Sequence, residues 1–310
     1  VKIVQCGFYC KGYECGDISG EYDTSTQTAA KKFRSDAGFP NTNGNMPPLF
    51  IMALLNTDAF VLISGGKPYV REAQQYLNSN YFIHFKTWGL IPCNGVPDRN
   101  MMKGIIAALQ YEEANHSMSG VDGIYGDNTL AGAPTLSTGT SQSAYVKIVQ
   151  MCLMCMMETN PGLDGVYDSS LASLISDFQD FYCLSTATSG VVNRVTWASL
   201  LSSKGDTTRP ALACDTSYQL NSTTANALYQ NGFRYVGRYL SGTVGSGANE
   251  RPKNLTRNEL SAIFSAGLRV FALFQEGAVT PTKFTQAKGQ SDGVKAIATA
   301  ISLGIPSGEI

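Results

Sequence analysis

The sequence has few charged side chains and very little histidine. Only 15% of its 310 residues are Asp, Glu, Lys or Arg, the formal net charge is −1, and there are two histidines. A nearly balanced charge gives no electrostatic footprint for DNA or for anionic lipid, so we expect no nucleic-acid partner. With so little histidine and no second C-x-x-C pair, we also expect no metal site.

Long apolar runs are missing as well. No run reaches the length of a membrane span, and the most apolar stretch, VKIVQMCLMCMM at 146–157, is expected to form one helix of a bundle. The chain has no initiator Met and no secretory signal peptide at Val1, which predicts a start that was processed or trimmed. No membrane-spanning segment is therefore expected.

The sequence does contain an internal repeat. VKIVQ opens the chain at 1–5 and returns at 146–150, and VREAQ at 70–74 keeps the valine and the glutamine. When the three valines are placed in one column, the agreement continues through most of each unit. Such self-similarity is the sequence signature of a repeat architecture.

Each repeat reads as helix, turn, helix, turn and short helix. The first turn has the form G-x-x-D, in which the glycine supplies a tight bend and the aspartate can cap the next helix. These turns begin at Gly20, Gly95 and Gly165. Within the second helix the aligned residues are Phe33, Ala108 and Phe178. One unit would bury a small core, whereas three packed together would protect one another's apolar faces.

The third unit carries a family resemblance. The order V-x-x-x-Q, then DG-x-Y-D with F-Q at 164–179, then SG-V-V-N-x-x-T-W-x-x-L at 189–200, resembles a small three-helix peptidoglycan-binding module. The first unit departs from it at Pro47–Pro48, and the second has an insertion around 83–92. The resemblance implies three all-α modules, at 1–64, 65–139 and 140–205. For any single module, a spacer that binds nothing is an equal alternative.

The eight cysteines need an explanation. Cys6 and Cys10 lie on the first helix of unit one, and Cys152 and Cys155 on the first helix of unit three. A C-x-x-C pair can bind zinc, but we expect these four thiols to be buried, reduced and metal-free. Free thiols favour folding in a reducing compartment, so a protein acting outside the cell or at the wall would be released by lysis or carried on a particle.

A different pattern follows the linker around 202–210. Strand and helix now alternate. Strands are predicted at 211–215, 233–240 and 268–275, and helices at 221–230, 255–267 and 284–303. Three such units in a row imply parallel strands, in either an open doubly wound sheet or a closed barrel. No G-x-G-x-x-G follows the first strand, which disfavours a nucleotide fold, and we expect no cofactor.

Polar residues stand at three consecutive strand ends. They are Asp215, then Arg238 with Tyr239, then Gln275 with Glu276. In a barrel the active residues lie where strands end and loops begin. Taken alone, each acid would be a turn cap or a solvated side chain, but polar residues at all three ends favour a site.

The same segments carry a second resemblance. C-D-T-S, G-F-R-Y-V-G-R-Y-L, L-T-x-x-E-L and A-x-x-x-A-x-x-L-G-I-P resemble a glycoside-hydrolase-like domain of unknown function related to the family-25 muramidases. We place this domain at 206–310, and the resemblance covers 211–310 of it. The resemblance implies a (β/α)8 TIM barrel. Only part of the barrel would be present, because the chain ends where the fourth strand should begin. The resemblance also implies that Asp215 lies in the active-site cleft, lined by Tyr239, Gln275 and Glu276.

These observations predict a modular cell-wall protein. Three bundles bind peptidoglycan, and a lysozyme-like barrel of an endolysin or phage-tail lysin hydrolyses the glycan strand with two carboxyl groups. Asp215 and Glu276 are the catalytic candidates, with a further acid expected beyond Ile310, and Arg238, Tyr239 and Gln275 are the substrate-binding candidates. Two alternatives stay open: a catalytically silent glycan-binding barrel, and a structural component of a phage tail or injection device. The chain ending at Ile310 is expected to be inactive alone.

Overall fold

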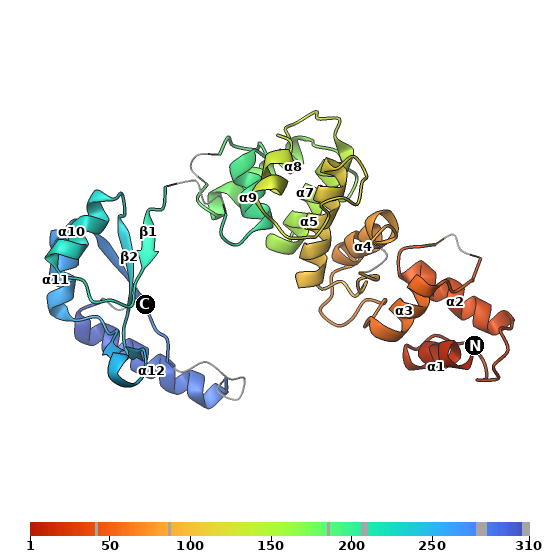
Figure 1. The fold of residues 1–310 in the computed structure, drawn as a ribbon, viewed down its shortest axis with the longest axis horizontal. Coiled ribbons are helices and arrows are strands. Elements are labelled where there is room, and N and C mark those ends of the chain that lie inside the picture. Colours follow the sequence, from red (N-terminus) through yellow and green to blue (C-terminus); the bar gives the residue numbers. More distant parts are fainter. Residues whose placement is uncertain (41–42, 86–87, 185–186, 206–209, 277–283, 306–310) are drawn as a thin grey trace. The chain divides into compact units, whose positions relative to one another are not determined.

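The computed structural model divides the chain into two compact units, at 1–206 and 207–310 (Figure 1). Each unit is described by itself. The residues that the structure describes are 1–40, 43–85, 88–184, 187–205, 210–276 and 284–305. None of the helices in these ranges is long and apolar enough to cross a membrane.

The first unit contains three successive groups of three α-helices. The order of helix, turn, helix, turn and helix, which the repeat predicts, is present in each group. The groups are α1 (Lys2–Cys10), α2 (Thr24–Asp36) and α3 (Pro48–Asn56); α4 (Pro68–Leu77), α5 (Arg99–Glu113) and α6 (Asp127–Gly132); and α7 (Ser143–Met156), α8 (Ser169–Phe181) and α9 (Arg194–Leu201). A short π-helical segment, η1 (Asn78–Phe82), continues α4.

A buried glutamine explains why the motif V-x-x-x-Q recurs in all three groups. Gln5, Gln74 and Gln150 are at most 1% exposed. Each side-chain carbonyl accepts a hydrogen bond from the glycine N–H of the following turn. The three glycine donors are Gly20 at 3.0 Å, Gly95 at 2.9 Å and Gly165 at 3.1 Å. The glutamine therefore ties the first helix of each group to its first turn, and a buried amide needs such partners.

The aspartate of each turn caps the second helix, as predicted. Asp23, Asp98 and Asp168 accept hydrogen bonds from backbone N–H groups three residues later, at 2.8, 2.7 and 2.9 Å. The turn glycines adopt left-handed backbone angles, between +75° and +91°, which a residue with a Cβ adopts only with strain. The G-x-x-D turns thus fix both the bend and the start of the next helix.

A second glutamine corrects the alignment within the second helix. Gln110 and Gln179 each accept from a glycine of the second turn, Gly123 at 2.8 Å and Gly190 at 3.0 Å. Both then donate to a threonine of the short helix, at 3.1 and 2.9 Å. Since these glutamines are equivalent, Leu109 matches Phe178, so the second unit is slipped by one residue relative to the alignment of Ala108 with Phe178, as its Leu109–Gln110 pair indicates in the sequence.

The three groups share one apolar core. Buried side chains from α1 to α9 form a single cluster, and α7 packs against both α5 and α4. Trp197 of the third group is fully buried and donates to the carbonyl of Pro134, at 2.7 Å. The expectation that packed repeats protect one another's apolar faces is confirmed for the second and third groups.

Two of the four cysteine expectations are wrong. Cys152 is buried and Cys155 partly so, but Cys6 and Cys10 are exposed. Helices α4 and α5 of the second group pack against α7. No described helix of another group packs to a similar extent against α1. All eight cysteines are free, and the buried thiols outside α7 are Cys15 and Cys93.

The second unit is built on three parallel strands in the order β1-β2-β5, as the alternating pattern predicts. The strands are β1 (Ala213–Asp215), β2 (Tyr235–Tyr239) and β5 (Arg269–Leu273), and the helices are α10 (Ser222–Gln230), α11 (Arg257–Ser265) and α12 (Gln286–Leu303). A small hairpin, β3 (Thr243–Val244) and β4 (Arg251–Pro252), encloses the 3-10 turn η2 (Gly247–Asn249). The fourth strand expected after the last helix falls on 306–310, outside the described residues.

Candidate functional site

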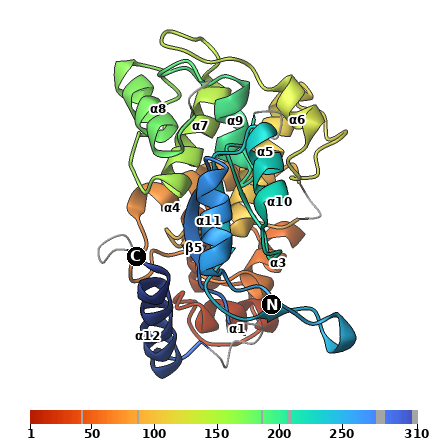
Figure 2. The same cartoon turned by 90° about the vertical axis from the view of Figure 1, so that its left-hand side faces the viewer.

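The two faces of the parallel sheet differ in what covers them. Successive side chains of a strand point to opposite faces. Val236 and Arg238 of β2 are fully buried, and Val236 belongs to the core formed with α10 and α11; Figures 1 and 2 show these two helices beside the sheet. On the other face, Tyr235 is 41% and Phe271 is 40% exposed. We call this exposed side the open face of the sheet.

Gly237 keeps the open face accessible between its neighbours. It is paired with Asp215 of β1 on one side and with Phe271 of β5 on the other. A Cβ at this position would lie 2.9 Å from the Cβ of Asp215 and 2.6 Å from the Phe271 ring. A larger residue would therefore push against both neighbours and displace the aspartate.

Asp215 and Tyr239 meet at the carboxyl ends of adjacent strands. Each is the last residue of its strand, and the Tyr239 hydroxyl donates to Oδ2 of Asp215, at 3.1 Å. The hydrogen bond to the carboxylate raises the pKa of Tyr239, so the phenol keeps its proton. The pair presents a carboxylate oxygen and a hydroxyl to solvent.

Lys253 joins this site, although the sequence pattern did not single it out. Its ammonium donates to the backbone and side-chain oxygens of Gln275, both at 3.1 Å, and lies 4.3 Å from the centroid of the Tyr239 ring. The β3–β4 hairpin returns the chain to the sheet and places this lysine there. Lys253 thus connects Tyr239 to Gln275, the residue expected at the end of the third strand.

Arg238 lies elsewhere than expected for a substrate contact. Its side chain is 0% exposed and forms an ion pair with Glu259 of α11, with Nε and Oε1 at 2.5 Å. It also donates to the backbone carbonyls of Thr216 and Lys253. The guanidinium therefore links the segments that carry Asp215 and Lys253. It positions these two residues from the buried face of the sheet and does not itself face solvent.

Glu276 is held by a cation of α12. Lys295 donates to its carboxylate at 2.5 Å, and this bond lowers the pKa of Glu276. An acid that stays ionised at neutral pH is suited to act as a base or nucleophile and is poorly suited to donate a proton. The strand-end residues that the structure joins into one chain of contacts are Asp215, Tyr239, Lys253 and Gln275.

The arrangement suits recognition of a polar ligand. A carboxylate, a phenol, an ammonium and an amide line an open sheet face with two partly exposed aromatic rings, and hydroxyl-bearing ligands use such groups. In the described part of the chain no three His, Cys, Asp or Glu side chains cluster as metal ligands.

Family models match two segments of the chain. Residues 226–310 match the Rv2525c-like, glycoside hydrolase-like domain. Residues 63–201 match the FadG/YbfG, PGDB-like domain. The first match includes Tyr239, Lys253 and Gln275 but begins after Asp215. The second spans the second and third helix groups together, which we expected as separate domains and which share a core in this structure.

Two proteins of Bacillus subtilis (strain 168) are similar over the whole chain. The uncharacterized protein YbfG is 39% identical over 308 residues, which are 99% of this chain and 41% of YbfG. The uncharacterized protein FadG is 34% identical over 312 residues, which are 100% of this chain and 53% of FadG. The chain thus spans about half the length of these relatives, or less. No solved structure matches.

Proposed function

We propose that this chain acts on bacterial peptidoglycan, with the helical unit binding the wall and the strand–helix unit engaging its glycan strand. One observation carries the proposal: the Asp215–Tyr239 pair, with Lys253 and Gln275 beside it, lies on the open sheet face at the strand ends. Most of this site falls in the segment that matches a glycoside hydrolase-like domain. Strand ends are where barrel enzymes carry their active residues.

The proposed reaction is hydrolysis of a glycosidic bond of the muramidase type. Such hydrolysis uses two carboxyl groups, one to protonate the leaving oxygen and one as nucleophile, stabiliser or base. In this proposal the domain is a (β/α)8 barrel related to the family-25 muramidases, and Asp215 supplies one carboxyl. Tyr239 then orients Asp215 and donates to a sugar hydroxyl, while Lys253 and Gln275 hold the neighbouring ring.

The helical unit would supply wall binding through three small modules. The threefold repeat and its turn-anchoring glutamines support a common ancestry of these modules. The low charge of the chain supports binding to a largely uncharged glycan through hydrogen bonds. In this proposal the protein acts at the cell wall. The free thiols of Cys6 and Cys10 favour folding under reducing conditions before the protein reaches the wall.

A second candidate is a glycan-binding domain without hydrolytic activity. The ion pair of Glu276 with Lys295 favours it, because it keeps Glu276 ionised, and an ionised carboxyl cannot protonate the leaving oxygen. In that case the same four residues bind the glycan and no bond is broken. The two candidates share the site and differ only in turnover.

The test compares Asp215→Asn with Asp17→Asn, an exposed aspartate of the first unit, as the matched control. Affinity for purified glycan strands is measured for both variants in the 310-residue chain. Because this chain is expected to be inactive alone, release of reducing ends is measured for both variants in a longer chain that completes the proposed barrel. We expect Asp215→Asn to lose at least about tenfold in affinity or in turnover, equivalent to about 1.4 kcal/mol, since a charged acceptor becomes neutral without a change in size. Unchanged affinity and turnover in Asp215→Asn would remove this site from the function.

A further inference from the structure

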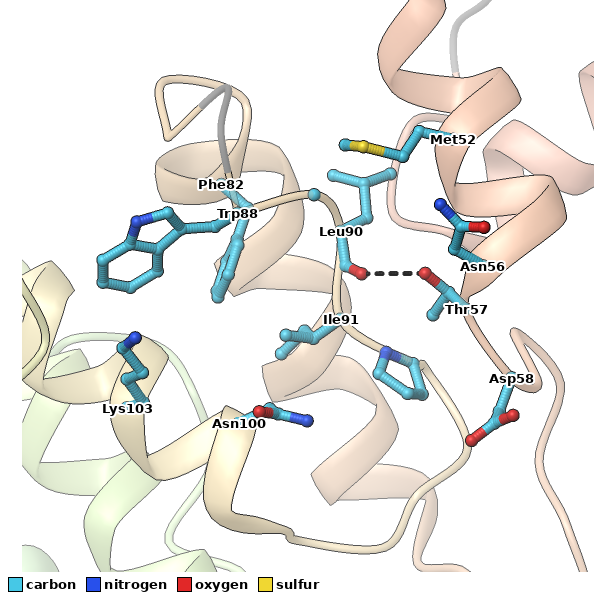
Figure 3. Close-up of a pocket in the computed structure, with 12 residues that line it drawn as sticks. Met52, Asn56, Thr57, Asp58, Phe82, Trp88, Leu90, Ile91, Asn100 and Lys103 are labelled. Carbon is cyan, nitrogen blue, oxygen red and sulfur yellow. Dashed lines mark hydrogen bonds between the residues drawn. The ribbon is translucent and has the colours of Figure 1, made fainter.

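The first and second helix groups enclose a pocket of about 490 Å³ that the repeat pattern does not explain. One wall comes from the end of α3 and the loop after it, and the other from the segment 88–92 and the start of α5. Figure 3 shows Met52 and Asn56 on one side, Lys103 and Asn100 on the other, and Leu90 and Ile91 between them. The segment 88–92 belongs to the insertion of the second repeat. The pocket is thus specific to this repeat.

The walls are fixed by hydrogen bonds to buried or anchored groups. Thr57 donates to the carbonyl of Leu90 across the pocket, at 3.2 Å. The ammonium of Lys11 holds the neighbouring loop through the carbonyl of Asp58, at 2.8 Å. On the opposite wall the fully buried Asn78 exchanges two hydrogen bonds with the backbone of Ile91, both at 2.9 Å. A site held this way is largely formed before a ligand arrives, which lowers the entropy cost of binding.

The lining combines polar side chains that lack partners with an apolar floor. The side chains of Asn56 and Asp58 are exposed and make no hydrogen bond with any described residue. Lys103 projects from α5 with its ammonium 4.4 Å from the centroid of the Trp88 ring. Leu90 and Ile91 supply the buried apolar floor. Concave sites with apolar walls and a few convergent polar groups are the usual form of small-molecule sites, which measure about 300–1000 Å³.

The chemistry of the lining indicates a neutral ligand with both polar and apolar faces. Asp58 and Lys103 bring one charge of each sign, so neither an anion nor a cation is favoured as a whole. Asn56 offers an amide donor and an acceptor, Asp58 accepts from hydroxyl groups, and Lys103 donates. The apolar floor suits a methyl group or the C–H face of a sugar ring. These requirements are met together by an N-acetylated sugar.

We propose that this pocket is a binding site for N-acetylhexosamine residues of a glycan strand. The proposal rests on the proposed function, because it gives the helical unit a place where it holds the wall polymer. It assigns the role to the junction of the first and second groups, where the insertion of the second repeat forms part of one wall, and not to the repeated turns. Asn56, Asp58 and Lys103 are the contacts that the ligand would use, and Trp88 lies beside Lys103.

The test is titration of the 310-residue chain with tetra-N-acetylchitotetraose, followed by calorimetry and by tryptophan fluorescence. The chain has two tryptophans, of which Trp197 is 0% exposed, so a change on binding reports on Trp88. The variants are Asn56→Ala, Asp58→Asn and Lys103→Ala, with the exposed Asp17→Asn and Lys31→Ala as matched controls. We expect each pocket variant to weaken binding by about tenfold, and the controls to bind like the unaltered chain. Thermal melts followed by circular dichroism verify that the variants fold.

The outcomes separate this proposal from the proposed function. If the chain sediments with peptidoglycan but the oligosaccharide does not bind, or binds equally to pocket variants and controls, the pocket proposal is overturned and wall binding stands. Failure of both assays contradicts the proposed function as well. Binding of a wall stem peptide in place of the oligosaccharide, lost in the same variants, would show that the pocket takes a peptide and would overturn the sugar assignment.

Discussion

Two helices of this protein contain the same sequence KIVQ, at 2–5 in α1 and at 147–150 in α7, but its isoleucine is exposed in one helix and buried in the other. In α1 and α7 the glutamine of VKIVQ is buried alike, 0% exposed for Gln5 and 1% for Gln150. The isoleucine two positions earlier is 69% exposed as Ile3 and 0% as Ile148. The glutamine has the same local role in both helices, because it ties each helix to the turn that follows it. The exposure of the isoleucine side chain depends instead on whether helices of neighbouring groups pack against it. The repeat thus specifies the fold of each group, and packing between groups decides which apolar residues are covered.

The largest effect is expected from truncating the isoleucine in both helices. Ile148→Ala should destabilise the first unit by about 2–5 kcal/mol, because it opens a cavity in the core that the helix groups share. Ile3→Ala should change the free energy of unfolding by less than about 0.5 kcal/mol, as for exposed positions. Urea unfolding followed by tryptophan fluorescence measures both, since both tryptophans lie in the first unit. Equal losses would contradict the comparison.

The glutamines should instead behave alike. Gln5→Ala and Gln150→Ala each leave a turn N–H without its buried acceptor, which costs about 1–3 kcal/mol. We expect the two losses in unfolding free energy to agree within about 0.5 kcal/mol, with conservative Gln→Glu variants as a check on side-chain size. A loss confined to Gln150 would show that the glutamine also depends on packing between groups.

Thiol reactivity gives a smaller, kinetic test of the same contrast. Cys6 and Cys10 of α1 should react with a maleimide in the native protein. Cys152 of α7 should react only when the unit opens, because burial raises the pKa of its thiol well above the usual value; burial also raises the pKa of Cys155 to about 12. Mass spectrometry of the peptides after timed labelling measures this. Rapid native labelling of Cys152 would contradict the packing of α7.

The smallest effect is a pH dependence found in one group only. Burial raises the pKa of Glu113 in α5 to about 7, whereas Tyr182 holds the equivalent position in the third group. For an acid with a raised folded pKa, stability is full below the unfolded pKa of about 4.3 and falls as pH rises through about 7.

Glu113→Gln should therefore match the unaltered chain below about pH 4, where Glu113 is protonated in both states, and be more stable at about pH 8, by on the order of 1 kcal/mol after allowing for solvent screening. Thermal melts at both pH values measure the difference, with the exposed Glu14→Gln as control. An identical pH profile for Glu113→Gln and the unaltered chain would show that Glu113 keeps its ordinary pKa.

The sequence predicted local features better than those set by tertiary neighbours. Helix caps such as Asp23 and strands such as 235–239 follow from short sequence patterns, and the structure contains both. The burial of Arg238 could have been predicted from strand alternation, since Tyr239 beside it points to the other face. Lys253 could not, because only the β3–β4 hairpin brings it to Gln275. The exposure of Cys6 likewise depends on which helices pack against α1.

Sedimentation of the 310-residue chain with purified, protein-free peptidoglycan tests the central claim most directly. The account predicts saturable binding that weakens only slightly between about 50 and 200 mM salt, because few phosphate-like charges are neutralised and few counterions released. Recovery of the whole chain in the supernatant at every peptidoglycan concentration would contradict the claim that this protein binds the cell wall.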